Sequence, residues 1–124
     1  MSNKIIKINR GDSYAFSISI PRKDNFLENY LLDEAKDVVY FAVMMPHQPF
    51  EKAFLLQGYT FEDQNEDGSI IVKITPNDTR LLAPGIYYYT VKLQRGGTIG
   101  VINDGDEPEE VRTIIERTKF IVCE

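Results

Sequence analysis

Apolar and polar side chains alternate along most of the chain, with the period of two that is typical of a strand with one buried face. In the clearest stretch, Tyr14, Phe16, Ile18 and Ile20 alternate with alanine and serine. The same alternation predicts further strands near residues 6–8, 70–74, 86–93 and 111–123. Turn-forming residues separate these segments, at 10–12, 65–68 and 96–97.

One segment lacks this alternation. Residues 38–45 are apolar at every position, so both faces of the strand predicted at 37–45 need to be covered. Such a strand is either central in the fold or presents its outer face to another chain. We therefore expect a partner surface on the second face of this strand, formed by Val38, Tyr40, Ala42 and Met44.

Three segments depart from the strand pattern. Residues 76–82 begin with proline and predict a single helical turn that crosses between two sheets. Residues 25–31 predict a short helix, because Asn25 can cap it and Glu28 follows three residues later, as in a capping box. The stretch 50–56 suits either a helical turn or a strand, and the strands on both sides of it favour a strand.

These elements predict an all-β fold. About seven short strands, turn signals roughly every ten residues and one crossing turn favour an antiparallel immunoglobulin-like β-sandwich with one short inserted helix. A partly open barrel is the alternative architecture. A length of 124 residues is that of a single domain, 1–124, with a core that needs neither disulfide nor metal.

The net charge, the single cysteine and the single histidine exclude several classes of function. The 14 Lys+Arg against 19 Asp+Glu give a net charge of −5, which excludes a general attraction to nucleic acid or to an anionic membrane. The run 103–110 contains five acids and no base, which is typical of a solvated loop. The single cysteine excludes an intrachain disulfide, and the single histidine excludes His-pair metal sites. No apolar run is long enough for a secretory signal or a membrane span.

One stretch has the spacing of calcium ligands. Asp63, Asn65 and Asp67, followed by Gly68, match the first six positions of an EF-hand loop. The twelfth position should be a bidentate glutamate and is Ile74, and the flanking segments are predicted strands. A hairpin turn is the alternative interpretation, because Asn, Asp and Gly favour tight turns.

No residue set predicts catalysis. His47 lies in a proline-bounded loop, and Cys123 has no partner that would lower its pKa. The tripeptide at 10–12 is an integrin motif, although its glycine and aspartate also suit a tight turn. We therefore expect neither an enzyme nor a cofactor.

The aromatic residues suggest two environments. Tyr87 and Tyr89 share one strand face, and we expect them in the core with their hydroxyl groups reaching the backbone, as in tyrosine corners. Tyr40 and Tyr88 are candidates for an exposed aromatic patch that binds protein.

Several of these segments together resemble the N-terminal domain of phage baseplate upper proteins. They are Ile8-Asn9-Arg10-Gly11-Asp12 before a Phe/Ile strand, the apolar strand 38–44, the stretch 71–89 with its D-T-x-x-L-x-P-G-x-Y-x-Y pattern, and the closing Phe120-Ile121-Val122. The resemblance covers most of the chain except 22–36 and 100–110. It implies an immunoglobulin-like domain that builds or docks onto a phage or prophage tail, with no catalytic residues to carry over.

The resemblance completes the functional hypothesis. It implies a non-enzymatic structural protein of the virion tail, assembled in the bacterial cytoplasm through contacts with other phage structural proteins or with copies of itself. Family members continue into a long C-terminal part that holds the receptor-binding protein, whereas this sequence ends at Glu124, which favours an adaptor or decoration module. The alternative is a carbohydrate-binding or adhesion module on a virion or bacterial surface, using exposed tyrosines and calcium.

Overall fold

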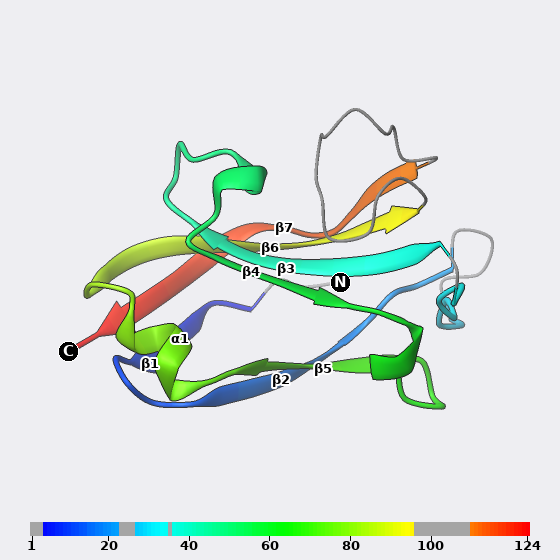
Figure 1. Cartoon of the computed structure of the whole chain (residues 1–124), viewed down its shortest axis with the longest axis horizontal. Helices are drawn as coiled ribbons and strands as arrows, with labels where there is room; N and C mark the ends of the chain where they lie inside the picture. Colours follow the sequence, from blue (N-terminus) through cyan, green and yellow to red (C-terminus); the bar gives the residue numbers. More distant parts are fainter. Residues whose placement is uncertain (1–3, 23–26, 35, 96–109) are drawn as a thin grey trace.

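The computed structural model describes residues 4–22, 27–34, 36–95 and 110–124, which form two β-sheets (Figure 1). The larger sheet has five strands in the order β1-β7-β6-β3-β4, and the smaller sheet pairs β2 with β5. The strands are β1 (Ile6–Asn9), β2 (Tyr14–Ser19), β3 (Asp37–Met44), β4 (Leu55–Tyr59), β5 (Ser69–Ile74), β6 (Gly85–Arg95) and β7 (Glu110–Cys123). The prediction of an all-β fold is confirmed.

Strand direction differs from the prediction at one place. β1 runs parallel to β7, with Ile6 beside Phe120 and Asn9 beside Cys123. The pairs β3–β4, β3–β6, β6–β7 and β2–β5 are antiparallel, as expected. The larger sheet is therefore mixed.

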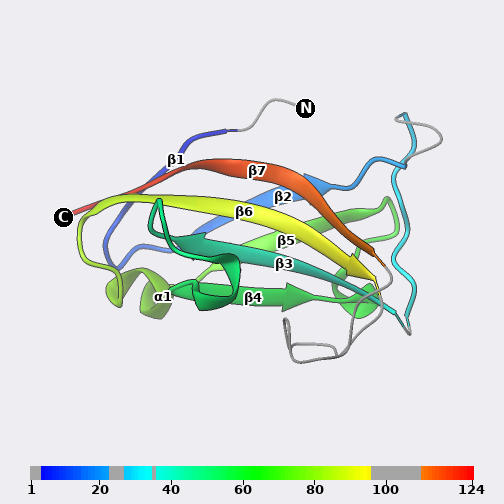
Figure 2. The ribbon, with the colours of Figure 1, turned by 90° about the horizontal axis from the view of Figure 1, so that it is seen from above.

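The main hydrophobic core lies between the two sheets, which stack on each other (Figure 2). Alternate residues of each strand enter it, as the period of two predicted. The central strands β3 and β6 contribute Val39, Phe41, Val43, Tyr89 and Val91, which are all buried. Opposite them, the smaller sheet contributes Ile18, Ile70, Val72 and Ile74.

The crossing turn is confirmed as α1 (Pro76–Arg80), which connects β5 of the smaller sheet to β6 of the larger one. Thr75 caps its N-terminus by accepting a hydrogen bond from the backbone of Asp78, and the Asp78 carboxylate accepts one from the Thr75 N–H in return. This reciprocal capping box satisfies two backbone donors that a five-residue helix would otherwise leave unpaired.

The stretch 50–56 is only partly a strand. Phe50–Lys52 form the 3-10 turn η1, and β4 begins at Leu55. The sequence prediction was therefore wrong for 50–54, where the helical spacing of Phe50 and Ala53 prevails. A second 3-10 turn, η2 (Phe61–Asp63), follows β4.

The helix predicted at 25–31 is not formed in its described part. Asn29 instead makes an antiparallel bridge with Pro21, and the N–H groups of Arg22 and Tyr30 donate to the carbonyls of Glu28 and Ile20. These ladder bonds occupy the backbone groups that a helix would need. Leu27 is 96 % exposed, so the predicted apolar helix face is not buried at this position.

Two further sequence features lie outside the described residues, namely the hairpin glycines at 96–97 and the acidic run at 103–109. Within the described part, none of the helical segments has the length and apolar character needed to cross a membrane.

Candidate functional site

The second face of β3 is not an open surface, which corrects the sequence expectation. Val38, Tyr40, Ala42 and Met44 are all buried, at most 3 % exposed, and form a second small core with Phe50. The chain itself therefore covers this face. The sequence correctly indicated that both faces of the strand need cover, but it did not indicate where the cover comes from.

The cover is the segment 45–54, which folds back across the larger sheet (Figure 1). The ring of Phe50 meets Tyr40 edge-on at 6.2 Å, and the Lys92 ammonium lies 4.8 Å from the centre of the Phe50 ring. Arg117 of β7 donates to the carbonyls of Pro46 and Gln48 at 2.9 and 2.8 Å. These contacts come from three strands, so they hold the segment across the sheet rather than at one edge.

The tripeptide Arg10-Gly11-Asp12 is docked onto α1. The buried Thr79 hydroxyl accepts from the Gly11 N–H at 3.0 Å and donates to the Asp12 carbonyl at 2.9 Å. Arg10 donates twice to the Arg80 carbonyl. Gly11 has a φ of 88°, which favours glycine at this turn. These contacts support the interpretation of the tripeptide as a structural turn.

The two inward tyrosines behave as expected. Tyr87 donates from its hydroxyl to the Ala83 carbonyl at 2.7 Å, four residues upstream, and Tyr89 donates to the Lys4 carbonyl. Both rings are buried in the main core. The expected exposed aromatic patch is not formed, because Tyr40 is buried and Tyr88 is half-buried.

The predicted calcium ligands each make hydrogen bonds within their own turns. The Asp63 carboxylate accepts from the Thr60 N–H, and the Asp67 carboxylate accepts from the backbone and hydroxyl of Ser69, which lowers the Asp67 pKa. Asn65 donates to the same Ser69 hydroxyl. These bonds support the hairpin interpretation, and among the described residues no group of three or more His, Cys, Asp and Glu side chains could hold a metal.

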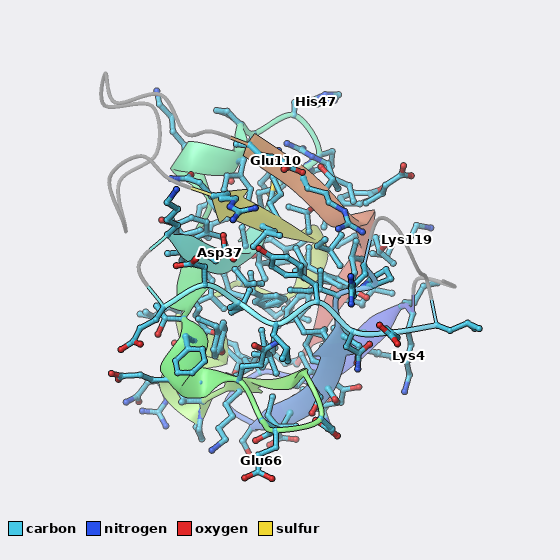
Figure 3. The ribbon with its side chains drawn as sticks, turned by 90° about the vertical axis from the view of Figure 1, so that its right-hand side faces the viewer. Lys4, Asp37, His47, Glu66, Glu110 and Lys119 are labelled. Atoms are coloured by element: carbon cyan, nitrogen blue, oxygen red, sulfur yellow. The ribbon has the colours of Figure 1, made fainter. Side chains whose placement is uncertain are left out.

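The residues considered for catalysis are dispersed. His47 lies in the exposed loop after β3, at the margin of the molecule away from Glu66 (Figure 3). Cys123 is a free, half-buried thiol at the end of β7. Within the described part of the chain, neither residue belongs to a group of three or more His, Cys, Asp and Glu side chains that could hold a metal.

A buried carboxylate joins the start of β3 to the segment before it. Asp37 is 1 % exposed, and its Oδ2 atom accepts from the Tyr30 hydroxyl at 2.6 Å and from the Asp33 N–H at 2.8 Å. Its other oxygen lies 3.8 Å from Arg95 Nε. Burial, together with the hydrogen bond to Asp37, raises the pKa of Tyr30 to about 12. These contacts make Asp37 the centre of a buried polar network that joins β3 to the preceding segment.

Three exposed apolar residues belong to the segments that adjoin α1 and Tyr87. Leu81 is 87 % exposed, Phe54 58 % and Ile86 51 %. The Phe54 ring meets the Tyr87 ring edge-on at 5.9 Å, and Tyr87 in turn is bound to Ala83, which lies between Leu81 and Ile86 in the chain. We name Phe54, Leu81 and Ile86 the apolar end. Sequence reasoning missed it, although the consecutive Leu81 and Leu82 were a signal, since only Leu82 is buried.

The comparisons with protein-family models, curated proteins and solved structures found no match for this chain.

Proposed function

We propose that the chain is a non-enzymatic structural protein of a phage or prophage tail, an adaptor or decoration module that works through protein–protein contacts. The observation that carries the proposal is the mutual docking of the segments that resemble baseplate upper proteins. Arg10-Gly11-Asp12 binds Thr79 and Arg80 of the D-T-x-x-L stretch. A pattern whose members bind each other marks an architecture rather than a catalytic site.

The proposed architecture is immunoglobulin-like. In that fold strands G, F and C neighbour each other in one sheet, and B and E belong to the other. The order β7-β6-β3 with β4 beside it, and the pair β2-β5, correspond to this arrangement. The hydroxyl of Tyr87 near the start of β6 reaches back to the backbone of Ala83, which is the tyrosine corner typical of strand F.

The partner surface in this proposal is the apolar end. Phe54 and Leu81 are 58 % and 87 % exposed, and in this proposal they form one apolar patch, the kind of surface that is typical of interaction sites. The face of β3 no longer qualifies, because Phe50 and the segment 45–54 cover it. A partner at the apolar end would meet a rigid base, since Tyr87 and α1 are both tied to the backbone around them.

Co-sedimentation with purified tail-like particles tests the proposal. We expect the wild-type chain to sediment with the particles and the double variant Phe54→Glu/Leu81→Glu to remain in the supernatant. Val111→Glu is the matched control, because Val111 is 53 % exposed at the start of β7, and that end of the strand lies away from α1 (Figure 1). Absence of the wild-type chain from the particles would contradict the proposed function. Equal sedimentation of the double variant and the control would contradict the proposed surface.

A further inference from the structure

Strand β2 has a partner on one side only. It pairs with β5 from Tyr14 to Ser19, and no strand in the described part of the chain borders its other edge. Viewed from above, β2 lies under the β7 side of the larger sheet, and β5 lies nearer β4 (Figure 2). The edge of β2 is therefore the outer edge of the smaller sheet.

The hydrogen bonds of β5 determine which backbone groups of β2 point outward. Lys73 donates from its N–H to the Tyr59 hydroxyl, and its carbonyl accepts from Gln57, so its backbone points away from β2. The N–H and carbonyl of Ser69 likewise bind Asp67 and Asn65. In an antiparallel ladder the residues opposite such positions also point outward. Those residues are Ala15 and Ser19. Ser17 lies two residues from each, so its backbone N–H and carbonyl also point outward.

The core is also less covered at this edge. The inward side chains of β5, Ile70, Val72 and Ile74, are at most 1 % exposed. On β2 the inward Tyr14 and Phe16 are only half-buried, although they pack against the same core. The missing neighbour would thus supply both extended backbone and apolar side chains on its inner face.

Other edges of the described sheets are protected along their length, whereas the edge of β2 is bridged only beyond the end of the strand, where Arg112 of β7 donates to the Pro21 carbonyl at 2.7 Å. Between β4 and β5, Gln57 and Tyr59 bridge to the Lys73 backbone at 3.0 and 3.2 Å. β1 has only four residues and includes Lys7. Natural proteins blunt sheet edges by charge, proline, bulges or short length. The six residues of β2, YAFSIS, have none of these.

We propose that a second copy of this chain pairs with β2 across a two-fold axis, centred on Ser17. The antiparallel register places Ala15 opposite Ser19 of the other copy and Ser17 opposite its own equivalent. All three outward-pointing residues then form hydrogen-bonded pairs, each exchanging two bonds. Phe16 of each copy comes to lie opposite Ile18 of the other copy, so each half-buried Phe16 ring gains an apolar neighbour. The uncharged strand allows this approach even though each chain has a net charge of −5.

Light scattering coupled to size exclusion, over a range of concentrations, measures the pairing on the chain alone. We expect a mass of twice 14.2 kDa for the wild type and a monomer for Ser17→Pro, which removes the outward N–H. An edge position tolerates proline, so far-UV circular dichroism should be unchanged. Ser17→Thr keeps the N–H and should remain a dimer. A monomeric wild type, a mass above two chains, or a dimeric Ser17→Pro would overturn the proposal.

A charge swap identifies the occupant as a second copy. Because Ser17 faces its own equivalent, Ser17→Lys and Ser17→Glu should each weaken the dimer, by about fivefold. Mixing the two variants should restore it, and failure to restore it would overturn the two-fold register. If Ser17→Pro does not fold, mixing the Ser17→Lys and Ser17→Glu variants still tests whether β2 forms the dimer. The inference does not rest on the tail proposal: a dimer that fails to bind particles would contradict the tail proposal alone.

Discussion

At the residue scale, Thr79 connects two turns that lie far apart in the sequence. Its hydroxyl, fully buried, binds the backbone of Gly11 and Asp12 and so fixes the turn between β1 and β2 to α1. The sequence placed both segments in turns but gave no sign that they meet, since 68 residues separate Gly11 from Thr79. A hydrogen bond between distant turns has no local periodicity that a sequence pattern could reveal.

Replacing Thr79 by valine keeps its shape and removes the hydroxyl. We expect the free energy of unfolding to fall by about 1 kcal/mol, because a part-buried N–H of Gly11 and a part-buried carbonyl of Asp12 lose their partner. Urea unfolding measures this change. Thr113→Val is the control: Thr113 is exposed on β7, and its replacement should change stability by less than about 0.5 kcal/mol. Equal stability of the two variants would contradict the role assigned to Thr79.

We expect Tyr30 to make the free energy of unfolding decrease at alkaline pH. Its pKa is raised from 10.0 to about 12, chiefly by burial and then by the Asp37 hydrogen bond, so the folded state holds the phenol proton more tightly than the unfolded state. The protonated Tyr30 phenol therefore contributes fully to the free energy of unfolding below pH 10, and this contribution is lost as the pH rises towards 12. We expect the free energy of unfolding to decline over that window.

Denaturant unfolding at pH 9 and at pH 12 separates this effect from general alkaline destabilisation. Tyr30→Phe removes the titrating group and should decline less between the two values. Tyr59 and Tyr89 also have raised pKa values because of burial, so some decline remains in the variant. A decline in Tyr30→Phe as large as in the wild type would show that Tyr30 does not titrate in this way.

At the element scale, β3 is a strand with a core on each face. Its uninterrupted apolar sequence predicted this property and left open whether another chain or the same chain covers the second face. The same chain covers it: Phe50 of η1 packs on this face, and Lys92 and Arg117 contact the segment that contains η1. The predicted helix at 25–31 failed for a related reason: a capping pattern is local, whereas the bridge from Asn29 to Pro21 is a tertiary contact.

A charge introduced on this face should destabilise the monomer rather than disrupt an interface. Tyr40 is 3 % exposed and Met44 is fully buried, so Tyr40→Glu or Met44→Glu buries an unpaired carboxylate. We expect losses of about 4 kcal/mol, a large part of the stability of a small domain. Thermal unfolding followed by circular dichroism measures them. Variants as stable as Val111→Glu, at an exposed position, would show that the face is open.

At the scale of the whole molecule, strand content, seven strands, the crossing helix α1 and the main core were predictable, because each rests on a period of two or on turn chemistry near the strand ends. The parallel β1–β7 pair, the cover over β3 and the open edge of β2 were not, because each depends on which distant segments meet. The apolar end belongs to the second group. Phe54 and Leu81 are ordinary apolar residues in the sequence, and the ring contact between Phe54 and Tyr87 joins segments that are 33 positions apart.

The central claim is that assembly uses the apolar end and not the face of β3. Hydrogen–deuterium exchange of the chain, free and bound to tail-like particles, tests it most directly. We expect the amides around Phe54, Leu81 and Ile86 to exchange more slowly in the bound chain, and those of Val38–Met44 to be equally slow in both states, because Phe50 already covers that face. Faster exchange of Val38–Met44 in the free chain, with protection gained there on binding, would contradict the account.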